Sequence, residues 1–164
     1  MQIRAATPDD SEAIAAIYAH HVLNGTASFD EVPPSVEFWR EKIAAIVAKD
    51  WPFLVAAEDG QVIGYCYATQ FRDRPAYAFT CENSIYVHPE RLGRGVGRAM
   101  LEALIKAAKA ATFREMIAVI GGAEPASVAL HRACGFVETG RMKSVGYKFG
   151  RWLDSLYMQL RLRG

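Results

Sequence analysis

The chain has 164 residues, the length of one ordinary domain, and we expect a single domain over residues 1–164. Apolar residues make up 51% of it and charged residues 23%, which are globular proportions and exclude a largely disordered chain. Nineteen Lys and Arg against 18 Asp and Glu leave a formal charge of +1, so we expect neither nucleic acid nor an anionic membrane as a partner.

The cysteine pattern and the N-terminus indicate the compartment. Cys66, Cys81 and Cys134 are widely spaced, form no CxxC pair and belong to no His/Cys cluster with zinc spacing. This usage fits a reducing compartment, and we expect no bound metal. The first residues lack the apolar run of a signal peptide, and no stretch approaches the roughly 20 apolar residues of a membrane span. We therefore expect a cytoplasmic protein.

Two helices are predicted near the beginning of the chain. The segment Thr7–Asp10 has the cap, the proline and the acidic residues that open a helix. Apolar residues then recur at the helical period at positions 14, 17, 18 and 22. After a turn-rich stretch that ends at Ser35, a second helix carries its apolar face at positions 36, 39, 43, 46 and 47.

Strands are predicted to follow. Residues 53–57 have the pattern of a strand, residues 58–61 that of a hairpin turn, and residues 62–71 that of the partner strand. A loop at residues 72–75 leads to an aromatic, β-rich run over residues 77–87.

The second half of the chain alternates helices and strands. A glycine-dense turn at residues 88–97 precedes a helix with apolar residues at 101, 104, 105 and 108. Residues 115–120 predict an interior strand, residues 125–135 a short helix that begins at proline and ends at glycine, and residues 156–160 a final strand. This order predicts a mixed α/β sheet with an antiparallel front half and a crossover in the back half.

The turn Arg91–Gly97 has the sequence RLGRGVG between a strand and an amphipathic helix. Glycines let the backbone approach a ligand, free amides at a helix start bind anions, and Arg94 and Arg98 add positive charge. A phosphate-bearing cofactor is the natural interpretation; a helix-opening turn without a ligand is the alternative. Because no Gly-Lys-Ser/Thr follows and the spacing is GxGxG, neither a nucleotide P-loop nor a dinucleotide-binding turn is predicted.

Longer motifs surround this turn. Ser84–Arg98 resembles the acyl-CoA-binding motif of the GNAT superfamily of N-acetyltransferases, and Ala129–Phe136 resembles the later helix-to-strand motif of that superfamily. Other segments resemble its phosphinothricin and methionine sulfoximine N-acetyltransferases: Thr26–Phe29, Trp51–Val55, Ala76–Tyr77, Glu82, Ala118–Gly121 and Gly146–Trp152. The similarity covers nearly the whole chain and implies a GNAT-like fold and a homodimer.

The resemblance also implies how acetyl-CoA is held. Backbone groups of Ile85, Tyr86 and Val87 would pair with the pantetheine arm. Backbone amides of the turn would bind the pyrophosphate, namely those of Gly93, Arg94, Gly95, Val96, Gly97 and Arg98. The sequence departs from the superfamily pattern at Leu92, where Gln or Arg is usual, and at Glu124, where Asn is usual, which puts a side-chain contact from Glu124 to pantetheine in question.

Glu82 is the candidate general base, because acetyl transfer needs a neutral amine and amino-acid amines are mostly protonated at neutral pH. Strand alternation places it with Thr80, Ser84 and Tyr86 on a polar face, opposite Cys81. From the residues alone an exposed edge-strand glutamate is the alternative. The resemblance puts Glu82 at the family's proposed base position, where burial would have to raise its pKa unless it acts through water.

His131 is the second catalytic candidate. It lies one turn after Ser127 on the short helix, and the resemblance matches it to a histidine of the phosphinothricin subfamily, where many superfamily relatives carry a tyrosine cast as general acid. His131 could protonate the leaving thiolate or relay the amine proton. A hydrogen-bonded helix residue is the alternative.

Acceptor-binding candidates lie around the same strand. Arg72 and Arg74 precede it, and a guanidinium pair suits a carboxylate or phosphinate on the acceptor, with solvated loop arginines as the alternative. Phe29, Tyr77 and Tyr147 are candidate apolar walls.

The resemblance thus implies an acetyl-CoA-dependent N-acetyltransferase acting by direct transfer on the α-amine of a small amino-acid analogue such as phosphinothricin, methionine sulfoximine or methionine sulfone. The rival mechanism is a covalent acetyl-enzyme at Cys81. The rival functions are N-terminal acetylation of proteins and a non-catalytic acyl-CoA-binding module, with a nicotinamide oxidoreductase more distant.

Overall fold

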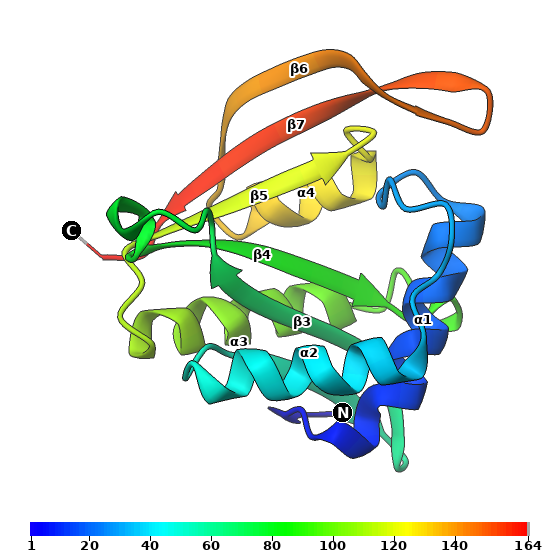
Figure 1. Ribbon diagram of the computed structural model, residues 1–164, viewed down its shortest axis with the longest axis vertical. Coiled ribbons are helices and arrows are strands. Elements are labelled where there is room, and N and C mark those ends of the chain that lie inside the picture. Colours follow the sequence, from blue (N-terminus) through cyan, green and yellow to red (C-terminus); the bar gives the residue numbers. More distant parts are fainter. Residues whose placement is uncertain (164) are drawn as a thin grey trace.

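The computed structural model describes residues 1–163, so Gly164, the last residue of the predicted domain, lies outside it. A seven-stranded sheet in the order β1-β2-β3-β4-β5-β7-β6 has helices on both faces (Figure 1). The strands are β1 Gln2–Ala5, β2 Phe53–Glu58, β3 Gln61–Gln70, β4 Thr80–Val87, β5 Glu115–Gly121, β6 Val137–Lys148 and β7 Arg151–Arg161. The helices are α1 Ser11–Asn24, α2 Val36–Ala48, α3 Val96–Ala110 and α4 Pro125–Ala133, with 3-10 turns at Pro8–Asp10, Pro75–Tyr77 and Pro89–Arg91.

The sheet has the predicted topology. Strands β1 to β4 pair antiparallel in order, whereas β4 and β5 are parallel and α3 connects them as a crossover. Strand β7 then pairs antiparallel with both β5 and β6. The mixed α/β sheet with an antiparallel front half and a crossover back half is therefore confirmed.

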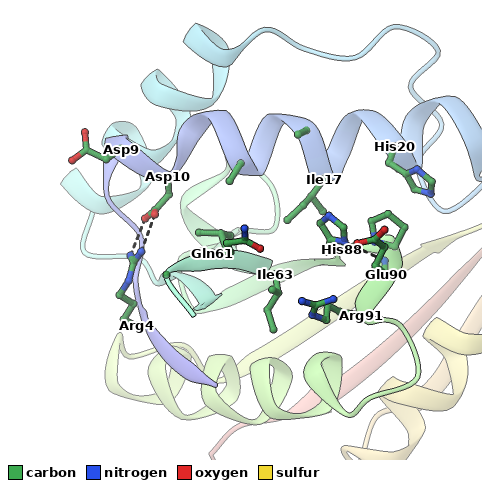
Figure 2. Close-up of a pocket in the computed structure, with 15 residues that line it drawn as sticks. Arg4, Asp9, Asp10, Ile17, His20, Gln61, Ile63, His88, Glu90 and Arg91 are labelled. Atoms are coloured by element: carbon green, nitrogen blue, oxygen red, sulfur yellow. Dashed lines mark hydrogen bonds and ion pairs between the residues drawn. The ribbon is translucent and has the colours of Figure 1, made fainter. Parts of the chain in front are cut away.

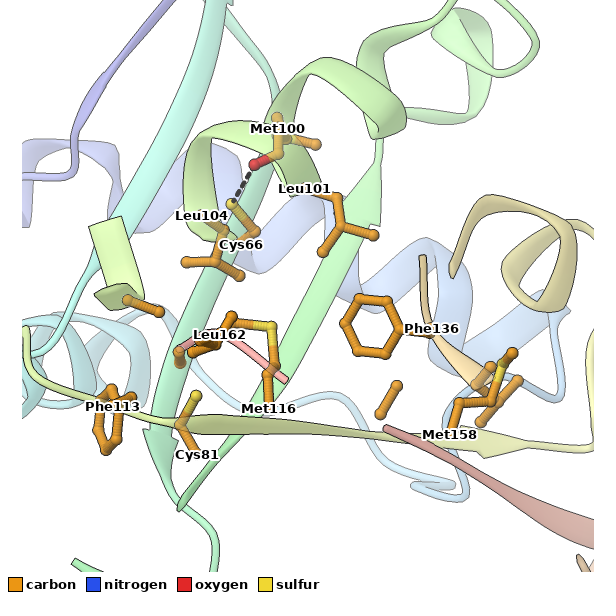
Figure 3. Packing of buried hydrophobic residues seen from close by; sticks show 14 of the residues in the cluster. Cys66, Cys81, Met100, Leu101, Leu104, Phe113, Met116, Phe136, Met158 and Leu162 are labelled. Carbon is orange, nitrogen blue, oxygen red and sulfur yellow. Dashed lines mark hydrogen bonds between the residues drawn. The ribbon is translucent and has the colours of Figure 1, made fainter. Parts of the chain in front are cut away.

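Each face of the sheet has its own apolar core. Helix α3 covers one face, where its buried side chains meet those of β3, β4, β5 and β7 (Figure 3); the cluster includes Cys66, Cys81, Met100, Leu101, Leu104, Phe113, Met116, Phe136 and Met158. Helices α1 and α2 cover the front half of the other face. Their side chains Ile14, Ile17, Trp39 and Ile43 form a core with the strand residues Phe53, Tyr65 and Tyr67. No helix within residues 1–163 is long and apolar enough to cross a membrane.

Two strands and one boundary differ from the sequence-based expectations. Strand β1 is four residues long, and β6 is almost wholly exposed with two register shifts, so neither has the alternation that predicts a strand. The hairpin turn between β6 and β7 is Phe149-Gly150, both with positive φ, as type I′ turns require. Strand β4 begins at Thr80 rather than residue 77, because Pro75–Tyr77 forms a 3-10 turn.

A buried lysine ties β6 to the loop after α1. The Lys148 side chain is 3% exposed, and its ammonium donates hydrogen bonds to the carbonyls of Val22, Gly25 and Ser28 at 2.7, 2.9 and 2.8 Å. Two of these carbonyls belong to the C-terminal end of α1, where the helix dipole favours a cation. The loop from Gly25 to Ser28 is thereby anchored on the C-terminal hairpin.

We expect Lys148→Met to lower the free energy of unfolding by about 3 kcal/mol, because three carbonyls lose a charged donor while the side-chain length is kept. Urea denaturation measures the change. Lys143→Met, on the exposed part of the same strand, is the matched control and should change stability by less than about 0.5 kcal/mol. Equal effects of the two variants would contradict the anchoring role.

Candidate active site

A cleft opens in the sheet where β4 and β5 separate. Only Thr80–Glu82 of β4 pair with Glu115–Ile117 of β5. Beyond these residues, β4 stays paired with β3 as far as Val87, and β5 stays paired with β7 as far as Gly121. The edge of β4 that faces the cleft therefore carries backbone groups that β5 does not satisfy. The cleft measures about 140 Å³ and is lined by Glu82–Tyr86, Ala118–Gly121, Ala27, Ser127 and His131.

Free backbone amides lie at the end of this cleft. Helix α3 begins after Gly95, and its first intrahelical hydrogen bond runs from the Ala99 amide to the Gly95 carbonyl at 3.1 Å. The amides of Val96, Gly97 and Arg98 therefore have no acceptor within the helix. A Cβ on Gly97 would lie 3.4 Å from Leu130 of α4 and 3.7 Å from Val87, so the helix start lies beside the end of β4.

Glycine geometry makes this turn a concave backbone surface. Gly93 and Gly95 have φ of +73° and +80°, and a Cβ placed on either would meet no atom within 4 Å. The left-handed backbone favours glycine, and the open space leaves the amides accessible to an anion. The arrangement fits a phosphate group, with β4 leading away from it.

The side chains around the turn are mostly engaged elsewhere. Arg98 pairs with Glu102 at 2.9 Å along α3, and Arg91 lies 3.4 Å from Glu58. Arg94 is exposed. The Glu124 carboxylate caps α4 by accepting hydrogen bonds from the Ala126 and Ser127 amides at 3.1 and 2.8 Å. The anion-binding capacity of the turn thus comes mainly from its backbone.

Glu82 lies at the point where β4 and β5 separate. Its side chain is 32% exposed, and its carboxylate forms an ion pair with the Arg72 guanidinium at 3.6 Å. Burial raises the pKa of the Glu82 carboxyl, and the positive charge of Arg72 opposes that rise. The carboxylate is thus a stronger base than an exposed glutamate and still faces the cleft.

Cys81 lies on the other side of β4. The β3–β4 register has no shift, so alternation directs Cys81 into the α3-side core, where it is 0% exposed. Burial raises the pKa of its thiol to about 12. Its geometry does not suit a nucleophile for the cleft.

His131 is buried on α4 and reaches the cleft from the opposite side to Glu82. Its Nδ1 lies 2.7 Å from the Ser127 carbonyl, and its Nε2 lies 3.2 Å from Nδ2 of Asn83. Burial lowers the pKa of the imidazole, and the Ser127 carbonyl only partly offsets this effect. His131 is therefore neutral near pH 7 in this environment, with Nδ1 protonated.

The predicted acceptor residues are divided between two regions. Arg72 stacks on Phe71 at 3.9 Å from the ring centroid, and Tyr77 packs edge-on against the same ring, both near the start of β4. Arg74 is exposed in that loop. Their loop therefore offers a cation and an aromatic edge next to Glu82.

Phe29 lies near the other end of the cleft. A Cβ on Gly146 would lie 2.5 Å from its ring, and one on Gly121 would lie 3.1 Å from it. Tyr147 instead packs with Trp152 on the exposed face of the hairpin, and neither Phe29 nor Tyr147 is among the residues that line the cleft. Phe29 follows directly after the loop that Lys148 anchors, so this anchor holds Phe29 in position.

Sequence reasoning did not single out Asn83 or Ala27 as cleft residues. Strand alternation puts Asn83 on the same face of β4 as Cys81, and a polar amide on that largely apolar face is the signal that could have found it. Ala27 has no such signal, because only the fold of the α1–α2 loop brings it to the cleft.

A larger cavity of about 520 Å³ lies elsewhere, between α1, the β2–β3 turn and the 3-10 turn after β4 (Figure 2). Arg91, His88 and Glu90 gather at one side of it, and the Arg4–Asp10 ion pair lies at the other. It contains neither candidate catalytic residue. No group of three His, Cys, Asp or Glu side chains in the described chain is placed to hold a metal ion.

We expect Arg72→Gln to raise the pKa of Glu82 further, since the opposing positive charge is lost and the burial remains. A raised carboxyl pKa means that the base form appears only at higher pH. NMR titration of the Glu82 side-chain carboxyl measures the shift directly, with Arg74→Gln in the same loop as the control. A lower or unchanged pKa in Arg72→Gln would contradict the electrostatic coupling.

Comparison with known proteins identifies the family. Residues 3–157 match the acetyltransferase (GNAT) domain. A phosphinothricin N-acetyltransferase of Alcaligenes faecalis is 49% identical over 158 residues, which cover 96% of this chain and 80% of that protein. An L-methionine sulfoximine/L-methionine sulfone acetyltransferase of Salmonella typhimurium is 38% identical, over 99% of this chain and 95% of that protein.

Solved structures agree with this assignment. A GNAT superfamily phosphinothricin acetyltransferase from Sinorhizobium meliloti, in complex with AcCoA, has a TM-score of 0.96 and 47% identity, covering 99% of this chain and 88% of that one. A ribosomal-protein-alanine N-acetyltransferase from Brucella melitensis has a TM-score of 0.95 and 39% identity, covering 98% and 99%. The domain match and these near-complete similarities show that this protein is an acetyltransferase of the GNAT family.

Proposed function

We propose that this protein transfers the acetyl group of acetyl-CoA to the α-amine of a small amino-acid-like compound. The observation that carries the proposal is the separation of β4 and β5, which puts the Glu82 carboxylate, an unpaired backbone edge and the free amides of α3 along one path. The names of the relatives supply the acceptor class, namely phosphinothricin, methionine sulfoximine and methionine sulfone.

Acetyl-CoA fits this path by its chemistry. The unpaired edge of β4 can hold the amides of the pantetheine arm through Ile85, Tyr86 and Val87, as a strand would. The backbone amides between Gly93 and Arg98 can hold the pyrophosphate. Because the Glu124 carboxylate is occupied by the N-terminus of α4, we propose no more than a secondary role for it in binding pantetheine.

Glu82 is the proposed general base. Its carboxylate takes one proton from the acceptor's ammonium, directly or through water, and the neutral amine attacks the thioester carbonyl. The carbon–nitrogen bond forms as the carbon–sulfur bond breaks, and a backbone N–H near Tyr86 or Val87 stabilises the carbonyl oxygen. His131, which lines the same cleft, takes the remaining proton that the nitrogen must lose and passes it to the departing sulfur.

The acceptor would lie between Glu82 and the aromatic loop after β3. Arg72 has a guanidinium fork that can bind the acceptor's carboxylate or phosphinate while remaining close to Glu82, and Arg74 adds charge in the same loop. Tyr77 is the proposed apolar wall in this loop, and Phe29 is the proposed apolar wall at the other end of the cleft. Tyr147 is left outside this pocket because it packs with Trp152 on the exposed hairpin.

Glu82→Gln should lower kcat by about 100-fold or more, because the amide cannot take a proton. Cys81→Ala should stay within about threefold of the unchanged enzyme if the transfer is direct. Initial rates of CoA thiol release measure both. The reverse result, an active Glu82→Gln and an inactive but folded Cys81→Ala, would establish a covalent acetyl-cysteine route.

N-terminal acetylation of proteins is the second candidate, and the similarity to a structure named ribosomal-protein-alanine N-acetyltransferase favours testing it. Thiol release should be compared for free amino acids, oxidised methionine analogues and short peptides. We expect turnover with the first two classes, because Arg72 and Arg74 suit a small anionic acceptor. Turnover with peptides alone would move the function to protein acetylation, and acetyl-CoA binding without turnover would indicate a binding module.

We also propose a cytoplasmic homodimer. All three cysteines are free, which fits a reducing compartment. Large apolar side chains are exposed along the β6–β7 hairpin, which supports an interface between copies there: Met142, Val145, Tyr147, Phe149 and Trp152. Sedimentation of the protein and of Trp152→Ala tests this assignment.

A further inference from the structure

Asn83 follows Glu82 on β4 and contacts His131, the other candidate catalytic residue. We propose that Asn83 is a positioning residue that holds His131 so that Nε2 accepts and returns a proton within the cleft, a role that rests on the proposed function. Both side chains line the cleft and are at least 93% buried, with 7% and 2% of their surfaces exposed.

The hydrogen bond at Nδ1 decides which tautomer His131 adopts. A carbonyl oxygen can only accept, so the 2.7 Å contact with Ser127 requires a proton on Nδ1. Neutral His131 then has its lone pair on Nε2, on the side facing β4. The α4 backbone therefore fixes the ring so that Nε2 is the atom that gains and loses a proton.

Asn83 can satisfy Nε2 in both protonation states. Its Nδ2 lies 3.2 Å from Nε2 and its Oδ1 lies 3.3 Å from Nε2. When His131 is neutral, the amide N–H donates to the Nε2 lone pair; when His131 is protonated, Nε2–H donates to the amide oxygen. Because both amide atoms lie at nearly the same distance, exchanging their assignment leaves the conclusion unchanged.

The surroundings of His131 leave this amide as its main polar partner on the cleft side. The ring packs edge-on against Phe136 at 4.9 Å, and Ser127 of its own helix occupies Nδ1. Glu82, the nearest carboxylate along β4, points to the other face of the strand. Arg132, the neighbour on α4, is exposed and lies 3.9 Å from Glu138. An uncharged partner therefore leaves His131 neutral at rest.

This arrangement gives the transfer step a balanced proton path. After Glu82 has taken one proton from the ammonium, attack on the carbonyl leaves the nitrogen with one proton more than the amide product holds. As the carbon–nitrogen bond forms, the Asn83 amide N–H leaves the Nε2 lone pair and Nε2 accepts that proton. As the carbon–sulfur bond breaks, Nε2 gives the proton to the sulfur and the Asn83 N–H returns. The products are the amide and the CoA thiol, and the proton on Glu82 passes to water.

NMR titration of ¹⁵N-labelled protein tests the contact without any reaction. We expect wild-type His131 to show the Nδ1–H tautomer and a pKa below the ordinary 6.5. Asn83→Asp should raise that pKa by about one unit or more, because a carboxylate then faces Nε2. Asn24→Asp, which adds the same charge at an exposed site outside the cleft, should leave it unchanged. An unmoved His131 pKa in Asn83→Asp would overturn the proposal.

A double-mutant cycle tests the role in the reaction. Asn83→Leu and His131→Gln should each lower kcat by about 10- to 100-fold with KM values within about threefold, and the double variant should be no slower than the slower single one. Multiplying losses would overturn the proposal, since Asn83 would then act independently of His131. If Asn83→Leu does not fold, Asn83→Asp replaces it in the cycle.

The two measurements separate this proposal from the proposed function. A wild-type protein that acetylates no small amine or peptide would overturn the function and this role together, whereas the titration would still establish the Asn83–His131 contact. Normal turnover with an unmoved His131 pKa in Asn83→Asp would leave the function standing and overturn this role alone.

Discussion

The structure depends on one constraint: β4 and β5 are held apart after three pairs of residues. Each strand has a full partner on its outer side, β3 for β4 and β7 for β5, and each is fastened by its own part of the core. Neither strand can move to close the gap without breaking those pairings. A row of backbone donors and acceptors is thus exposed inside the sheet, where an extended polar ligand can satisfy it.

The chemistry of the cleft follows from which side each residue of β4 faces. Glu82 is half-buried beside Arg72, so its pKa rises without the carboxylate losing access to the cleft. Cys81 and Asn83 face the α3 and α4 side, but only Asn83 reaches the cleft, because β5 has already turned away there. Burial makes the Cys81 thiol inert, whereas the buried Asn83 has a polar partner in His131.

The far end of the cleft is formed by segments distant in sequence. Lys148 fastens the loop after α1 to the C-terminal hairpin through three carbonyls, and this loop carries Ala27 and Phe29 against the end of β5. The exposed hairpin therefore has a structural role at this end of the cleft despite its weak strand pattern. The larger cavity is lined by the 3-10 turn after β4, including Arg91, but by none of the glycines that follow it.

The local sequence pattern was enough to predict the helices, the central strands and the glycine turn. Helix period, strand alternation and turn chemistry each depend only on residues that are close in the sequence. It also separated Glu82 from Cys81, because alternation needs only a regular strand. Long-range packing decided the rest. Strands β1 and β6 form by pairing rather than by an apolar pattern, and Tyr147 packs with Trp152. The Ser127 carbonyl sets the tautomer of His131, and Asn83 contacts its Nε2. The partners in the β1–β2 pairing and in the Asn83–His131 contact lie 48 residues or more apart in the sequence, a separation that no local pattern records.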